Sequence, residues 1–132
     1  MAPAEQVDSV DAGTVRVSVP AHSAFLQLLR LNVAGIAGGI FTTEEIEDVK
    51  IAIEELAAFT MAAPAGEPEL HVELVANDVL LVVRGWRALD PSGTIEKNEF
   101  LPLILDAVVD DYDLDVADDR VSFRFEKRTR EQ

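Results

Sequence analysis

The sequence predicts an α+β fold, a two-layer α/β sandwich whose mixed, mostly antiparallel sheet carries its helices on one face. Segments with alternating apolar and polar residues indicate strands, and segments with apolar residues three and four apart indicate helices. The two kinds follow one another in the order β, α, α, β, β, α, β, β. The 132 residues are 48% hydrophobic, which is sufficient for one domain with a buried core.

The beginning of the chain predicts a strand followed by a helix. Valines alternate with polar residues over 14–19, which is typical of a half-buried strand. Ser23 can cap a helix over 24–36, whose inner face is expected to consist of Phe25, Leu28, Leu29, Val33 and Ile36. Gly38 and Gly39 are expected to end that helix.

A second helix is expected over 43–61, because Thr42 and Glu45 have the spacing of a capping box. Its main inner face consists of Ile46, Val49, Ile53, Leu56 and Thr60. A second row consists of Ile51, Glu55 and Phe59. A helix that is apolar on two faces is usually covered on two sides. Glu55, between two apolar neighbours, is therefore a carboxylate that could line a pocket, although a surface position is the alternative.

The second half predicts four strands and one helix. The strands are expected over 70–76, 79–83, 112–116 and 121–127. Asn77-Asp78 has the residue types of a two-residue hairpin turn, and Asp118-Asp119 indicates another turn. The stretch 85–97 predicts a loop, and Asn98 can cap a helix that continues through Asp111.

The chain is expected to form a single domain over 14–127, with flexible ends at 1–13 and 128–132. No uninterrupted apolar run is long enough to span a membrane, so no membrane association is expected. The first residues lack the basic and apolar regions of a signal peptide, so the cytoplasm is the expected location. The absence of cysteine excludes disulfides, thiol catalysis and zinc–thiolate sites.

The net charge of −14 argues against nucleic-acid binding, which requires clustered basic residues. Lys127, Arg128 and Arg130 form a short basic patch that we expect to be a solvated end. An acidic surface can attract a basic protein partner. Acidity that serves solubility alone explains the composition equally well.

The sequence gives no reason to expect a metal site. Three aspartates resemble the start of an EF-hand loop: Asp111, Asp113 and Asp115. Val116 and Ser122 replace the glycine and glutamate that such a loop needs, and the alternation predicts a strand with outward aspartates. His22 and His71 lie on different predicted elements, which argues against zinc.

Residues 29–58 read LRLNVAGIAGGIFTTEEIEDVKIAIEELAA. A helix with an arginine precedes a glycine break, and Glu45–Glu55 then follow the pattern E-x-x-D-V-K-x-A-I-x-E. Over 14–127 the chain resembles the anti-sigma factor and serine-protein kinase family, which includes stress-response and sporulation regulators. That family belongs to the GHKL (Bergerat-fold, histidine kinase-like) ATPases, so the resemblance implies that fold.

The resemblance implies that the ATP-magnesium site of the family is lost. Glu55 matches the catalytic glutamate, but Phe59 stands where an asparagine holds magnesium, and a phenyl ring offers no oxygen. Arg84 and Trp86 replace the aspartate and a glycine of the D-x-G-x-G element. The glycine-rich phosphate turn corresponds to Glu99–Pro102, which contains no glycine. We expect Phe59 and Trp86 to fill part of an empty pocket.

The resemblance also implies protein partners. Arg30 matches an arginine with which the family contacts a sigma factor and an anti-anti-sigma antagonist, although an ordinary exposed arginine is the alternative. Family members dimerise, so a homodimer is expected. The expected function is anti-sigma-factor-like regulation of transcription by protein binding, without ATP or magnesium. The alternative is an active kinase that phosphorylates the antagonist, with Glu55 as its catalytic residue.

Overall fold

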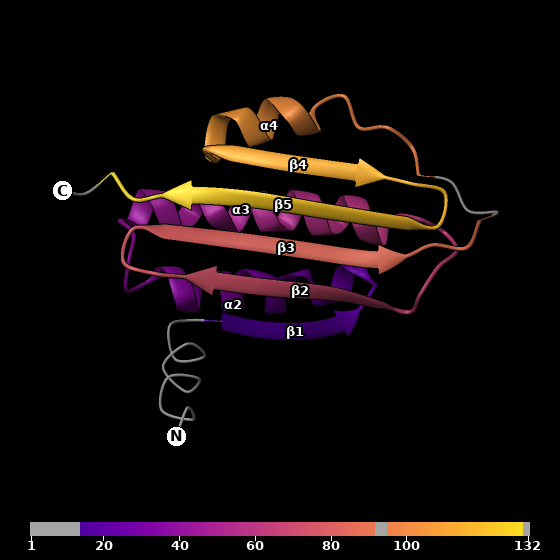
Figure 1. Ribbon diagram of the computed structural model, residues 1–132, viewed down its shortest axis with the longest axis horizontal. Helices are drawn as coiled ribbons and strands as arrows, with labels where there is room; N and C mark the ends of the chain where they lie inside the picture. The colour runs from indigo at the N-terminus through magenta and orange to yellow at the C-terminus, as the bar shows by residue number, and fades with distance from the viewer. Residues whose placement is uncertain (1–13, 92–94, 131–132) are drawn as a thin grey trace, which may run out of the picture.

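The computed structural model describes residues 14–91 and 95–130, so the expected flexible N-terminus at 1–13 lies outside the described residues. Five strands form one sheet in the order β1-β2-β3-β5-β4 (Figure 1). The strands are β1 (Thr14–Pro20), β2 (Glu69–Ala76), β3 (Leu80–Ala88), β4 (Asp111–Val116) and β5 (Arg120–Arg128). Their pairings are all antiparallel, so the sheet is antiparallel rather than mixed.

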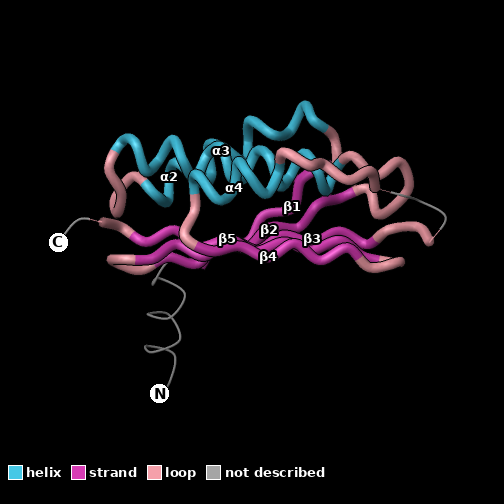
Figure 2. Tube along the Cα trace, turned by 90° about the horizontal axis from the view of Figure 1, so that it is seen from above, coloured by secondary structure: helices cyan, strands magenta, loops and turns pink. Residues whose placement is uncertain are grey.

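The helices lie together on one face of the sheet (Figure 2). They are α2 (Leu26–Ala37), preceded by a 3-10 turn η1 (Ser23–Phe25), α3 (Thr43–Met61) and α4 (Leu101–Val108). The predicted two-layer α+β fold is thus confirmed. None of the helices in the described part of the chain combines the length and apolar character needed to cross a bilayer.

The core lies between the helices and the inner face of the sheet. Strand β2 buries every second residue, as its alternation predicts, and α3 buries its expected inner face at Val49, Ile53 and Leu56. Each such aliphatic side chain contributes roughly 1.5–3 kcal/mol relative to an exposed one. This packing fixes the rotation of α3 and therefore the direction of its second row of residues.

The N-terminus of α3 is held by the predicted capping box. The N–H of Glu45 donates to Thr42 Oγ1 at 3.2 Å, and the N–H of Thr42 donates to Glu45 Oε1 at 3.0 Å. The other oxygen of this buried carboxylate accepts from the N–H of Arg130 at 3.1 Å. Glu45 thereby ties the end of the chain to the start of α3. The hydrogen bond from the Thr42 N–H is the main reason why the pKa of Glu45 is lowered.

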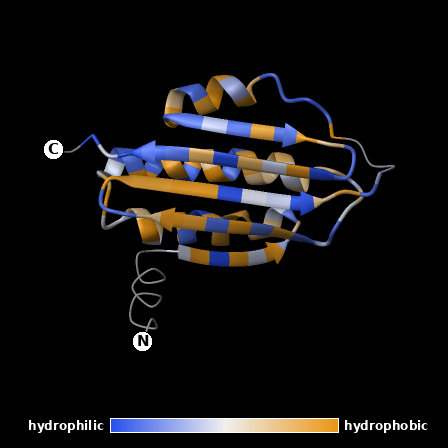
Figure 3. Cartoon of the chain, in the orientation of Figure 1, coloured by the Kyte–Doolittle hydropathy of each residue, from blue (hydrophilic) through white to orange (hydrophobic). Residues whose placement is uncertain are grey.

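Strand β3 continues to Ala88, so the prediction that it ends at 83 and that a loop begins at 85 was wrong. Figure 3 shows why, because only the first half of β3 is apolar. The polar half pairs with β2 on one side and β5 on the other, and these ladders supply its hydrogen bonds. Gly85 faces inward beneath the ring of Phe123, where an added Cβ would lie 2.2 Å from Phe123 Cζ.

The third helix is shorter than the predicted 98–111. Asn98 forms a turn ahead of it, with Asn98 Oδ1 accepting from the N–H of Phe100 at 3.0 Å, and α4 begins at Leu101. It ends at Val108, because Asp111 already pairs with Glu126 in the sheet. The turn predicted at Asp118-Asp119 is confirmed by the hydrogen bond from the N–H of Ala117 to the carbonyl of Arg120.

Lys127 does not belong to a solvated basic end. The alternation of β5 turns its side chain inward, and only 2% of it is exposed. Its ammonium donates to the carbonyl of Val108, at the end of α4, at 2.8 Å and to Asp48 Oδ2 at 3.1 Å. Strand β5 itself runs one residue past the domain end expected at 127.

Candidate functional site

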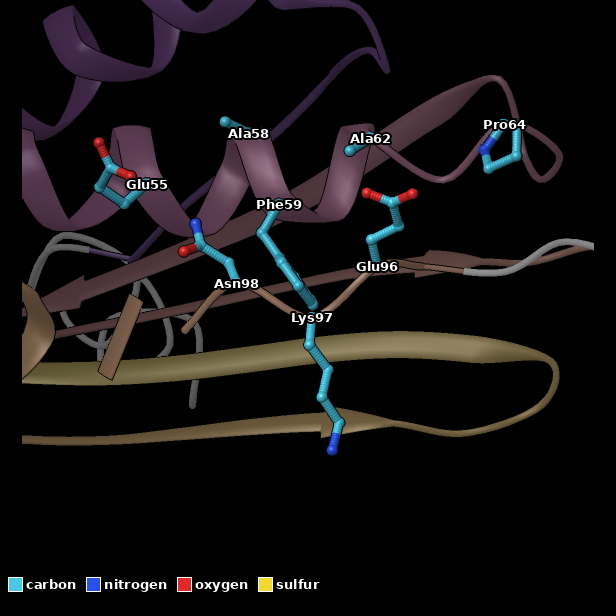
Figure 4. Close-up of a pocket in the computed structure, with 8 residues that line it drawn as sticks. All are labelled: Glu55, Ala58, Phe59, Ala62, Pro64, Glu96, Lys97 and Asn98. Atoms are coloured by element: carbon cyan, nitrogen blue, oxygen red, sulfur yellow. The ribbon is translucent and has the colours of Figure 1, made fainter. Parts of the chain in front are cut away.

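A pocket of about 520 Å³ lies between α3 and the 96–98 segment (Figure 4). Its lining consists of Glu55, Ala58, Phe59, Ala62, Pro64, Glu96, Lys97 and Asn98. Helix α3 supplies the first half of this lining, because the burial of its main apolar face turns the second row toward the pocket. The structure therefore places Glu55 and Phe59 in one pocket, as the i, i+4 spacing predicts.

The pocket is acidic and aromatic. Glu55 and Glu96 each contribute a carboxylate, and the ring of Phe59 reaches from α3 toward the opposite segment (Figure 4). Phe59 also packs against both hydrophobic clusters of the domain, so its ring is held in place. The side chain of Lys97 extends away from α3 (Figure 4). The charges that face the pocket from the described lining residues are therefore negative.

The turn before α4 has its first backbone donors already engaged. The N–H of Phe100 donates to Asn98 Oδ1, and the N–H of Leu101 donates to the carbonyl of Asn98 at 3.2 Å. Pro102 has no N–H. A helix N-terminus binds phosphate through such N–H groups. At these three positions none is available to do so.

Trp86 does not fill this pocket, contrary to the expectation from the sequence. It alternates with the inward Gly85 and Arg87, so it lies on the face of the sheet away from the helices. Its ring stacks on that of His71, with centroids 5.7 Å apart. Arg84 lies on the same outer face, at 3.8 Å from a carboxylate oxygen of Glu73. The expectation for Trp86 was wrong because it assumed that a loop begins at Gly85, whereas the strand continues to Ala88.

Arg87 is a residue that sequence reasoning missed. Only 5% of it is exposed, and burial lowers the pKa of its guanidinium. Its Nη1 donates to the carbonyls of Thr60 and Ala63, both at 3.1 Å, and its Nε donates to the carbonyl of Glu67 at 2.8 Å. Thr60 lies in the last turn of α3 and Ala63 follows the C-cap Ala62, where helix carbonyls have no intrahelical partner. Arg87 thereby holds the end of the helix that lines the pocket.

Arg30 lies elsewhere, on the surface where α2 runs beside α3. Its guanidinium is 3.6 Å from the carboxylate of Glu54, and both side chains are more than one-third exposed. Leu28 and Leu31 on the same helix are also exposed. The structure therefore separates the two predicted functional residues. Glu55 lines the pocket, and Arg30 belongs to a partly apolar outer surface of the helices.

The chain is similar to known proteins in sequence and in structure. A segment of 43 residues, 32% of this chain, is 46% identical to serine-protein kinase RsbW of Halalkalibacterium halodurans and spans 26% of that protein. The crystal structure of the RsbU and RsbW domains of Rv1364c from Mycobacterium tuberculosis matches 87% of this chain with a TM-score of 0.68. Over that segment the chain is similar in sequence to the kinase, and its fold is similar to that of the mycobacterial RsbW domain. No family model matches it.

These two matches confirm the predicted resemblance and fold. The structural match covers 32% of the longer mycobacterial chain at 11% sequence identity, so it carries the fold alone. Because the sequence match spans about a quarter of the curated kinase, the activity of that whole protein is a separate question.

Proposed function

We propose that this protein is an anti-sigma-factor-like regulator that acts by binding proteins and whose nucleotide site is degenerate. The observation that carries the proposal is Phe59, whose ring occupies the pocket beside Glu55. In the anti-sigma factor and serine-protein kinase family that the sequence resembles, the matching position holds the asparagine that coordinates magnesium. This half-buried phenyl ring supplies no ligand to a hard cation and removes space from the pocket.

Two further features of the pocket support the loss of nucleotide binding. Glu55 and Glu96 repel a triphosphate, while the side chain of Lys97 extends away from α3. The turn at Phe100 and Leu101 uses its N–H groups internally. Among the described lining residues, no positive side chain is directed at the phosphates, and the N–H groups of Phe100 and Leu101 are not free to bind them.

The surface around Arg30 is the proposed binding site for a sigma factor, an anti-anti-sigma antagonist or both. Among the described residues Arg30 pairs with Glu54, at 3.6 Å, and this exposed ion pair can open at little cost. The exposed Leu28 and Leu31 add the apolar area that protein interfaces use at their centres. A homodimer and a cytoplasmic location complete the proposal.

Calorimetric titration with ATP and magnesium tests the nucleotide half of this proposal. We expect no saturable binding at millimolar ATP, either for the natural chain or for Phe59→Asn. The single substitution restores a metal ligand but leaves the engaged turn unchanged. Micromolar binding by the natural chain would overturn the proposal.

A pull-down from native lysate tests the partner half. We expect recovery of a sigma factor or an antagonist-like protein, with loss of that protein for Arg30→Ala. Arg16→Ala is the matched control, because Arg16 is an exposed arginine on β1, paired with Glu73 in the sheet rather than on the helical surface. Recovery of neither class of protein, or equal loss with both variants, would contradict the assignment.

The second candidate function is an active kinase that phosphorylates the antagonist. Glu55 favours it, because a carboxylate remains on the pocket wall at the matching position. Transfer of labelled γ-phosphate to an antagonist protein, abolished by Glu55→Gln, would establish this candidate. Absence of transfer together with absence of ATP binding would exclude it.

A further inference from the structure

A group of potential metal ligands lies away from the pocket, where the chain enters β2. Glu67, Glu69 and His71 each present one ligand atom, and the three atoms lie within 4.8 Å of one another. Glu69 and His71 are two residues apart on one strand, so both project from the same face of the sheet. Glu67 comes from the link that precedes the strand.

Neighbouring groups orient two of these three ligands. Ser18 Oγ on β1 lies 2.8 Å from His71 Nδ1, and the ring of Trp86 stacks on the imidazole. The N–H of Ala88 donates to Glu67 Oε1 at 3.2 Å. His71 Nε2 and Glu67 Oε2 are thereby directed at each other in a hydrogen bond. Such outer contacts are the usual means of orienting metal ligands.

The charge at this position favours a cation. Glu67 and Glu69 contribute two carboxylates to the group. The guanidinium of Arg87 acts against a cation, but it is committed to backbone carbonyls, including that of Glu67.

We propose that Glu67, Glu69 and His71 bind a divalent transition-metal ion such as Zn²⁺, Co²⁺ or Ni²⁺. The imidazole selects this class, because clusters of oxygen ligands alone suit Mg²⁺ or Ca²⁺. His71 donates its Nδ1–H to Ser18 and offers the Nε2 lone pair to the metal. The metal replaces the proton shared between His71 and Glu67. Water completes the coordination at this partly exposed site.

The distances require only side-chain adjustment. Ligand atoms about 2.0–2.2 Å from a tetrahedral Zn²⁺ lie roughly 3.3 Å from one another. The hydrogen bond between His71 and Glu67 must open slightly, and Glu69, which is exposed, must approach by rotation about its own side-chain bonds. The backbone of β2 stays in its ladders with β1 and β3 throughout.

Trp86 provides the assay, because it is the only tryptophan in the chain and stacks on His71. Paramagnetic Co²⁺ or Ni²⁺ bound to this imidazole should quench its fluorescence. We expect saturable quenching of the untagged full-length chain at one equivalent of metal, reversed by a chelator and displaced by Zn²⁺. Quenching that rises linearly without saturation would overturn the proposal.

Matched variants assign the ligands. His71→Asn and Glu69→Gln should each weaken Co²⁺ binding by about tenfold or more, in line with the loss of a ligand. His22→Asn is the control, because His22 caps η1 through its Nδ1 and asparagine is also a good cap. Glu69→Gln leaves the stacked pair intact, so its result does not depend on the packing of Trp86. Unchanged binding by both ligand variants, or equal weakening by His22→Asn, would refute the site.

Discussion

Replacement of Arg87 by methionine should destabilise the domain severely. Methionine keeps most of the volume and removes every donor. The carbonyls of Thr60, Ala63 and Glu67, which accept from Arg87 at 3.1 Å or less, then lose their partner. Each such loss costs about 1–1.5 kcal/mol where water can partly replace the donor, so the sum is about 3–4.5 kcal/mol. This is a large part of the stability of a domain of this size, typically about 5–15 kcal/mol.

Urea unfolding, monitored by circular dichroism, measures this loss of unfolding free energy. In thermal unfolding of a chain of 132 residues, each kcal/mol lowers Tm by about 3–5 °C, so a decrease of about 10–20 °C is expected. Arg84→Met is the matched control, because Arg84 lies on the same strand but its side chain is 51% exposed. A loss below about 1 kcal/mol for Arg87→Met, or an equal loss for Arg84→Met, would refute the argument that Arg87 holds the end of α3.

Three further predictions test separate parts of the structure. The folded-state pKa of Glu45 is lowered, so its contribution to stability is complete above the ordinary value of 4.5 and disappears as the pH falls through the folded-state pKa. Glu45→Gln should therefore flatten the acid limb of a plot of unfolding free energy against pH, and an unchanged slope would contradict this. Lys127→Ala leaves Asp48 and the carbonyl of Val108 without their donor, so it should lower the free energy of unfolding by about 2–4 kcal/mol in urea. Asp48→Asn should lower it less. The reverse order would contradict the two hydrogen bonds assigned to the Lys127 ammonium. Gly85→Ala drives a methyl group into the ring of Phe123 and should lower Tm. Adding Phe123→Leu to the same chain should restore part of that Tm. An unchanged Tm for Gly85→Ala would show that the ring is free to move.

Local signals predicted most of the fold. Helix α3 begins and ends where the capping box and the apolar spacing predict, because both signals involve residues within a few positions of one another. The end of β3 could not be predicted in this way. Its polar half is a strand because β2 and β5 flank it, and these partners are distant in the chain.

The candidate sites also differ in whether local spacing or strand pairing brings their residues together. Glu55 and Phe59 lie four residues apart on one helix, so helical geometry alone placed them together. The position of Trp86 depends on which face of β3 it occupies. Because a loop was predicted there, the sequence did not predict that face. The sequence did not predict the proposed metal site at Glu67, Glu69 and His71. That proposal depends on Ser18 and Trp86, which the pairing of neighbouring strands brings beside the imidazole of His71.

The sequence by itself determined the order of the elements and the inner face of α3, and it placed at position 59 a phenyl ring, which has no oxygen. These follow from periodicity and side-chain chemistry, which are properties of short segments. Only the tertiary structure decided that Arg87 and Lys127 are buried. Hydropathy predicts that a charged side chain points to water, and it is buried only where distant backbone carbonyls or carboxylates offset its desolvation. Those partners come together only when the helices pack on the sheet.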